Sequence, residues 1–140
     1  MSNEEIRVVI ADDEPGMRMI MRKMIEKAVG FTLCGEADNG PDLLKLVERY
    51  KPQVCFLDVE MPGMDGISLA RRIRQDDKEV LLMFITNMAQ YALHGYEVEA
   101  IDYVIKPLGY QEFDLKMKKA MRYMGRHEKK QMMLQTTDGI

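Results

Sequence analysis

The sequence predicts an α/β fold, a doubly wound five-stranded parallel sheet with helices on both faces. Short apolar segments and segments of helical periodicity alternate five times along the 140 residues. The apolar segments are continuous rather than alternating, which is typical of strands that are buried on both faces. Right-handed crossovers between such strands produce a doubly wound sheet, in which ligands bind outside the carboxyl ends of the strands.

Each element is bounded by residues that break strands or end helices, such as Gly30 and the Lys51-Pro52 pair. The expected strands cover residues 6–11, 31–37, 54–57, 80–85 and 101–105. The expected helices cover about residues 15–28, 39–51, 66–74 and 89–96, and a fifth begins at Leu108. Helical spacing also predicts which side chains face the core. They are Ile20, Met24 and Ala28 in the first helix, and Leu43, Leu44 and Val47 in the second.

The composition is that of one globular domain that does not itself bind nucleic acid. The formal net charge is -3 and the pI about 5.5, whereas nucleic-acid-binding domains usually carry a basic excess. Cys34 and Cys55 lie in apolar stretches without a CxxC pair, so we expect buried free thiols in a reducing compartment. Residues 1–5 lack an apolar signal segment, and no run approaches the about 18 to 20 apolar residues that span a bilayer. We therefore expect a cytoplasmic protein.

Reactive side chains end four of the expected strands. Asp12 and Asp13 follow the first strand, Asp58 the third, Thr86 the fourth and Lys106 the fifth. Because the carboxyl ends of parallel strands meet at one edge of the sheet, we expect these side chains to lie together. Clustered carboxylates repel one another and favour a hard cation such as Mg²⁺. An ammonium and a hydroxyl beside them can hold phosphoryl oxygens, with Asp58 as a carboxylate nucleophile.

Each of these groups alone has a plainer explanation. An Asp-Asp pair after a strand is more often a helix cap or a solvated turn, and a threonine there is more often a capping residue. A Lys-Pro pair is usually a turn. The occurrence of all of them at four strand ends favours the phosphoryl-binding interpretation.

With these motifs, the sequence resembles the receiver domain of two-component response regulators over residues 6–124. The motifs that carry the resemblance are Asp12-Asp13, the segment LDVEMPGMDG at 57–66, Thr86 and Lys106-Pro107. The resemblance implies a flavodoxin-like sheet with strand order 2-1-3-4-5. It also implies a signalling domain rather than an enzyme, whose partner is a sensor histidine kinase.

The resemblance further implies a role for each site residue. Asp58 would accept a phosphoryl group from the kinase's phosphohistidine, and Lys106 and Thr86 would hold the phosphoryl oxygens. The implied cofactor is Mg²⁺. Its ligands would be the carboxylates of Asp13 and Asp58, the backbone carbonyl of Glu60, and Asp12 through a bound water. The Lys106-Pro107 bond is cis in the family.

A switch is also implied. Phosphorylation would draw the Thr86 hydroxyl inward and let Tyr103 move into the vacated space. This movement would reshape the face formed by the helix at 89–96, the strand at 101–105 and the last helix, and thereby control an output. The receiver would form a homodimer on phosphorylation. Asn87 departs from the small residue that the family mostly has after the threonine.

The second half of the sequence indicates the kind of output. Residues 91–103 are similar to receivers joined to LytTR-type DNA-binding domains. The last helix is long and is followed at 132–140 by a pattern that predicts a strand and a turn. Its expected core-facing residues are Phe113, Met117, Ala120, Met121 and Met124. We therefore expect a receiver domain at 1–124, and a linker and the start of a DNA-binding domain at 125–140. The whole protein would be a transcriptional regulator that contacts DNA only through that second domain.

Three other functions are weaker, and a fourth stays open. A phosphatase with an aspartyl nucleophile, of the haloacid-dehalogenase type, would need Asp-x-Asp after the first strand, and Asp12-Asp13 lacks that spacing. A flavodoxin-like cofactor binder would need a phosphate loop rich in Ser, Thr and Gly there. A stand-alone signalling receiver without DNA-binding output stays open, whereas the complete set of acidic residues, Thr86 and Lys106 argues against a degenerate receiver that only binds partners.

Overall fold

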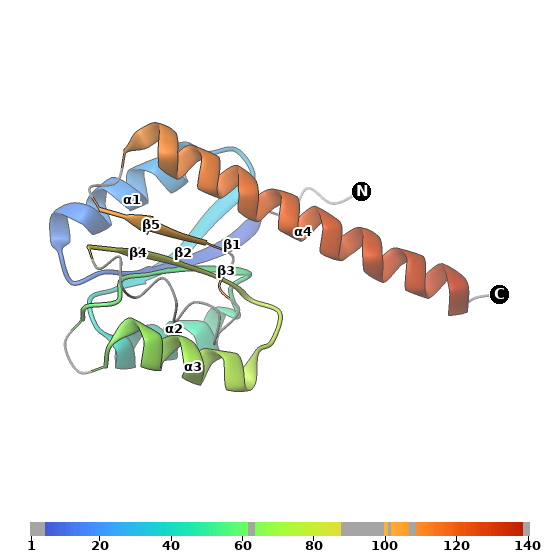
Figure 1. The fold of residues 1–140 in the computed structure, drawn as a ribbon, viewed down its shortest axis with the longest axis horizontal. Helices are drawn as coiled ribbons and strands as arrows, with labels where there is room; N and C mark the ends of the chain where they lie inside the picture. The colour runs from blue at the N-terminus through green and yellow to red at the C-terminus, as the bar shows by residue number, and fades with distance from the viewer. Residues whose placement is uncertain (1–4, 62–63, 88–99, 101, 107–108, 139–140) are drawn as a thin grey trace.

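The computed structural model describes residues 5–61, 64–87, 100, 102–106 and 109–138. It has one sheet of five parallel strands in the order β2-β1-β3-β4-β5, as expected (Figure 1). The strands are β1 (Ile6–Ala11), β2 (Phe31–Ala37), β3 (Val54–Leu57), β4 (Leu81–Thr86) and β5 (Asp102–Ile105). The helices of the described residues are α1 (Pro15–Lys27), α2 (Gly40–Tyr50), α3 (Gly66–Asp76) and α4 (Tyr110–Asp138). The helix expected at 89–96 lies outside the described residues.

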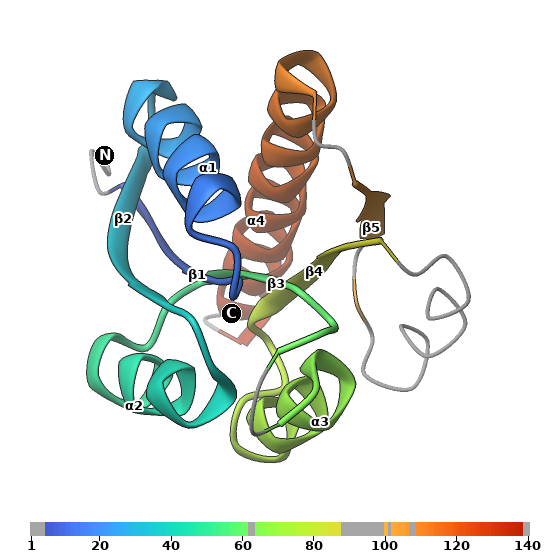
Figure 2. The same ribbon diagram turned by 90° about the vertical axis from the view of Figure 1, so that its left-hand side faces the viewer.

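The sheet separates two helical layers and two hydrophobic cores. Helices α1 and α4 cover one face, and α2 and α3 cover the other (Figures 1 and 2). Alternate residues of β1 serve the two cores. Val8 and Ile10 pack into the core beneath α1 and α4, while Val9 and Ala11 pack into the core beneath α2 and α3. The continuous apolar strands of the sequence are therefore buried on both faces, which is the property that predicted the fold.

The core beneath α1 and α4 is built around aromatic and methionine side chains. Phe56 of β3 and Phe113 of α4 are fully buried, with ring centroids 5.0 Å apart in a tilted arrangement. Helix α1 contributes Met21 and Ile25 to this core. The predicted position of Ile20 was wrong, because its side chain is 40% exposed. Met24 and Ala28, expected on the same face, pack partly buried against the core.

Turn chemistry accounts for the helix boundaries on the opposite face. The Asn39 side chain accepts a hydrogen bond from the amide of Asp42 and caps α2. Lys51 ends that helix in the left-handed conformation, with φ of 46°. Leu43 is fully buried and Leu44 and Val47 pack partly buried beside it, as predicted.

The carboxyl-terminal part of the chain differs from the prediction. Helix α4 runs without interruption to Asp138, so the strand and turn expected at 132–140 were wrong for the residues that the structure describes. Residues 128–135 are all Glu, Lys, Gln, Met or Leu, which are good helix formers and continue a helix that tertiary packing has started. Figure 1 shows the second half of α4 extending beyond the sheet. Phe113, Met117 and Ala120 are buried as predicted, whereas Met121 is exposed and Met124 is half-buried.

Both cysteines are free thiols, and burial raises the pKa of Cys55 to about 12. Cys34 is only partly buried. Among the described residues, no helix is long and apolar enough to cross a membrane.

Candidate functional site

The sheet register brings four strand ends together. Ala11 of β1 pairs with Leu57 of β3, so Asp12 and Asp58 emerge side by side. The amide of Asp58 also donates to the Ala11 carbonyl at 2.9 Å. At the next two strand ends, the amide of Lys106 donates to the Thr86 carbonyl at 2.8 Å. The expected convergence of these residues is therefore confirmed.

Lys106 is the centre of this pocket. Its Nζ lies 2.9 Å from Asp12 Oδ2, 3.1 Å from Glu14 Oε1 and 3.2 Å from Asp58 Oδ2. The lysine side chain is only 4% exposed, and the side chains of Asp12 and Asp58 are buried with it. A buried ammonium is stable only when anions surround it, and three carboxylates meet that requirement here.

The carboxylates fit a hard cation. Asp12, Asp13, Glu14 and Asp58 each place one carboxylate oxygen within 4.8 Å of the others. Asp12 Oδ2 is buried and has no hydrogen-bond partner among the described residues, although Lys106 pairs with it by charge. Asp13 is exposed, so the cluster is open to solvent on that side. An open set of oxygen ligands suits Mg²⁺, which retains several waters.

Burial and mutual repulsion alter the acid–base properties of the pocket. Burial and, next, the negative charge of Asp12 raise the pKa of Asp58 to about 6, against the opposing effect of Lys106. Burial also raises the pKa of Asp12. For Lys106 burial favours the neutral amine, but the contacts with Asp12, Glu14 and Asp58 outweigh it, so its pKa is raised. The lysine stays charged at neutral pH, and negative charge exceeds positive charge around it.

The loop after β3 holds Asp58 in place. Asp58 Oδ1 accepts the amide of Glu60 at 3.3 Å, and the amide of Gly66 donates to the Val59 carbonyl at 2.7 Å. Helix α3 starts so close to this loop that a Cβ on Gly66 would lie 2.2 Å from the Asp58 carbonyl oxygen. Only glycine permits this approach, so Gly66 determines where the Asp58 backbone lies.

The residues expected to form the switch are placed only in part. Thr86 is 2% exposed and ends β4 beside the site, and Asn87 after it is exposed. Tyr103 pairs with Phe84 in the β4–β5 register. The side chain of Tyr103 and all of Pro107 lie outside what the structure describes.

Comparison with known proteins identifies the family. The family model of the response regulator receiver domain matches residues 8–118. The chain belongs to the response regulator receiver domain family. This membership, the sheet order and the acidic pocket confirm the resemblance that the motifs suggested, and a receiver domain implies a cognate histidine kinase.

The relatives of this receiver domain include named regulators. It is 36% identical over 115 residues to the sensory transduction protein LytT of Oceanobacillus iheyensis, a match that covers 81% of this chain and 47% of LytT. It is 33% identical over 107 residues to the transcriptional regulatory protein YpdB of Escherichia coli, covering 76% of this chain and 43% of YpdB. The receiver domain thus spans about half the length of these curated relatives.

A solved receiver domain has the same fold. The response regulatory domain of protein mrkE from Klebsiella pneumoniae superimposes with a TM-score of 0.81 at 28% identity. The match covers 86% of this chain and 99% of that domain.

Two further residues of the pocket were not predicted from the sequence. Glu14 is not among the predicted site residues, yet it is a partner of Lys106. Its position next to Asp12-Asp13 was the signal that could have identified it. Arg18 donates from Nη1 to the Asp12 carbonyl at 2.7 Å, and no pattern in the sequence indicates that contact.

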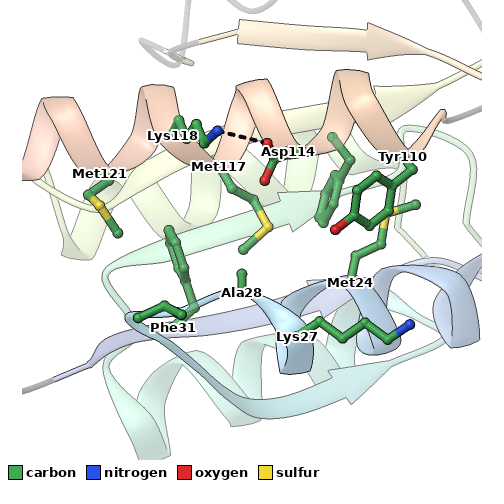
Figure 3. A pocket seen from close by; sticks show the side chains of 11 residues that line it. Met24, Lys27, Ala28, Phe31, Tyr110, Asp114, Met117, Lys118 and Met121 are labelled. Atoms are coloured by element: carbon green, nitrogen blue, oxygen red, sulfur yellow. Dashed lines mark ion pairs between the residues drawn. The ribbon is translucent and has the colours of Figure 1, made fainter.

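The receiver domain also has a groove of about 310 Å³ between α1 and α4 (Figure 3). Apolar side chains dominate its lining, among them Met24, Phe31, Met117 and Met121. The groove shares no residue with the acidic pocket, and its lining offers no cluster of carboxylates.

Proposed function

We propose that Asp58 is the phosphoacceptor of this receiver domain, taking a phosphoryl group from the phosphohistidine of a sensor histidine kinase. The observation that carries the proposal is the contact of Lys106 Nζ with Asp58 Oδ2 at 3.2 Å inside a buried acidic pocket. A carboxylate oxygen of Asp58 forms the bond to phosphorus while the phosphorus–nitrogen bond of phosphohistidine breaks. The electron pair returns to the imidazole, which takes up a proton.

The neighbouring residues have separate tasks in this proposal. Lys106 supplies a fixed positive charge for the phosphoryl oxygens, and the Thr86 hydroxyl donates to one of them. Asp13, Asp58 and the Glu60 backbone carbonyl would hold Mg²⁺ directly, and Asp12 would act through a water. When bound, the ion offsets the charge of the carboxylates and of the transferred group.

Treatment with acetyl phosphate and Mg²⁺, followed by intact-mass measurement, tests the proposal. We expect one phosphoryl adduct on the wild-type chain. The adduct should be absent from Asp58→Asn and from wild type treated with a chelator. An adduct that persists in Asp58→Asn would show that another residue accepts the group.

The same experiment separates the receiver from an aspartyl phosphatase. A receiver takes up one phosphoryl group per chain. The amount of acetyl phosphate consumed should therefore level off near the molar amount of protein, apart from slow hydrolysis of the adduct. Rapid continued turnover would favour the enzyme.

We infer further that phosphorylation acts through Thr86 and Tyr103 on the face that includes β5 and α4, and that the receiver then forms a homodimer. The register supports this route, because Thr86 pairs with Ile105 and Phe84 with Tyr103.

We also propose that the output is transcription by a LytTR-type regulator. Residues 1–124 would be the receiver, and residues 125–140 would connect it to a DNA-binding domain. Support comes from the names of LytT and the transcriptional regulator YpdB and from the half-length match to both. Footprinting of the full-length protein with and without acetyl phosphate tests this output, and a stand-alone receiver would leave no footprint.

A further inference from the structure

We infer that Arg18 is a positioning residue for the acidic pocket, fixing the peptide unit between Asp12 and Asp13 and thereby the direction of both carboxylates. The inference rests on the proposed Mg²⁺ site and names a residue that organises it. It starts from the hydrogen bond of Arg18 Nη1 to the Asp12 carbonyl, which is 2.7 Å long. Such a short bond from a guanidinium is of the strong, charge-assisted kind.

The Asp12 carbonyl is a sensitive point at which to act. It belongs to the planar peptide that joins Asp12 to Asp13, so its orientation sets ψ of Asp12 and φ of Asp13. These two residues lie between the end of β1 and the start of α1, outside regular secondary structure. The carboxylates of the pair repel each other and Asp58, and only fixed contacts keep them turned toward one site.

The remaining groups of Asp12 are held from other directions. Its amide donates to the Ala37 carbonyl at 3.1 Å, and its Oδ1 accepts the amide of Glu14 at 2.9 Å. Its Oδ2 faces Lys106. Arg18 supplies the contact to the carbonyl, and it comes from α1, one turn beyond the pair.

Arg18 is itself held by an ion-pair network. Its Nε lies 3.5 Å from Glu36 Oε1 on β2, and its side chain is 18% exposed. Arg22 donates to the same carboxylate, from Nε to Oε2 at 2.8 Å and from Nη2 to Oε1 at 3.2 Å. Glu36 thus fixes the guanidinium of Arg18 in the orientation that reaches Asp12, which lowers the entropy that the contact would otherwise cost.

Charge and positioning have opposite effects here, which makes the inference testable. Arg18 is a positive charge beside a cation site, so its removal by charge alone would tighten Mg²⁺ binding. Loss of the carbonyl anchor would weaken it. Partners that orient metal ligands are typically worth ten- to hundredfold in metal affinity, and we expect about tenfold here since Arg18 acts through the backbone.

The experiment compares Arg18→Met with Lys23→Met, which removes an exposed charge from the same helix. Mg²⁺ is titrated into the full chain without a phosphodonor, and amide NMR shifts give the dissociation constant. We expect the constant to rise about tenfold in Arg18→Met and to stay within about twofold of wild type in Lys23→Met. The ¹³C shift of the Asp12 carbonyl should change in Arg18→Met only.

Arg18→Lys is the second variant, because it keeps the positive charge at this position. A lysine can reach one acceptor but cannot bridge Asp12 and Glu36 as a guanidinium does, so we expect an intermediate constant. Unchanged or tighter Mg²⁺ binding in both Arg18 variants, or equal weakening in Lys23→Met, would overturn the inference. A wild-type chain that binds no Mg²⁺ would instead contradict the proposed function.

Discussion

Lys106 faces more negative charge than it can neutralise. Asp12, Glu14 and Asp58 all lie within 3.2 Å of its Nζ, and Asp13 adds a fourth carboxylate to the cluster. At neutral pH one ammonium cannot offset these charges, and the buried carboxylates repel each other. The pocket is therefore poised to gain stability from any further positive charge or from loss of a negative one.

The pH dependence of stability should report this repulsion. Because the pKa of Asp58 is raised to about 6, the folded chain binds its proton more tightly than the unfolded chain. The stability that the Asp58 proton adds to the folded chain is fully present below the carboxyl pKa of the unfolded chain. It is lost as the pH rises through 6. In chelator at pH 7, we expect Asp58→Asn to have a free energy of unfolding about 1–2 kcal/mol above that of wild type, after allowing for water that reaches the pocket.

Urea unfolding of both proteins between pH 4.5 and 7.5 measures the effect. The difference should shrink as the pH falls and Asp58 becomes protonated in the wild type. Saturating Mg²⁺ at pH 7 should reduce it as well, because the ion stabilises the carboxylate form. If the difference in free energy of unfolding is constant across this pH range, the ionised Asp58 carboxylate is not the source of the repulsion.

Among the elements, the start of α3 has the tightest constraint on the site. A Cβ on Gly66 would lie 2.2 Å from the Asp58 carbonyl oxygen and 2.7 Å from the Val59 Cα, both backbone atoms that cannot rotate away. We expect Gly66→Ala to destabilise the chain by about 1–3 kcal/mol and to lower the rate of phosphorylation. The two effects would have one cause, a displacement of the Asp58 loop.

Gly16→Ala is the matched control. Gly16 lies in the first turn of α1, where an added Cβ would meet nothing within 4 Å. Alanine is the better helix former, so this variant should be neutral or up to about 1 kcal/mol more stable. Thermal unfolding of both variants decides the matter, and a Gly66→Ala chain as stable as Gly16→Ala would contradict the close approach.

The elements also show which features a sequence can predict. The strands and their convergence followed from continuous apolar runs and from reactive residues at their ends. The buried face of α1 was misjudged at Ile20, because Met21 is as apolar as its neighbours and only the packing beneath α4 selects between them. The contacts of Glu14 and Arg18 depend on where long side chains reach, which periodicity does not encode.

At the scale of the whole molecule, the acidic pocket is linked to α4 through the edge of the sheet. Thr86 ends β4 beside the pocket, and its carbonyl accepts the Lys106 amide at the end of β5. At the other end of β5, Asp102 accepts hydrogen bonds from Lys116 and Lys119 of α4. A displacement at Thr86 can therefore reach β5 directly. It can reach α4 through the ion pairs of Asp102 and through the core that Val104 of β5 shares with Phe113.

This connection predicts a separation of phosphorylation from signalling in Thr86→Ala. Asp58 and Lys106 are unchanged in that variant, so it should still accept one phosphoryl group, whereas the hydroxyl that would follow the group is gone. In wild type, acetyl phosphate should shift the backbone amide signals of residues 102–106, and in Thr86→Ala these shifts should be largely lost. Thr86→Ser keeps the hydroxyl and should retain them, which distinguishes loss of the donor from a change in packing at β4. If the alanine variant shows the wild-type shifts once phosphorylated, the change in β5 arises without the Thr86 hydroxyl, and Lys106, which adjoins the same strand, becomes the connection between the pocket and α4.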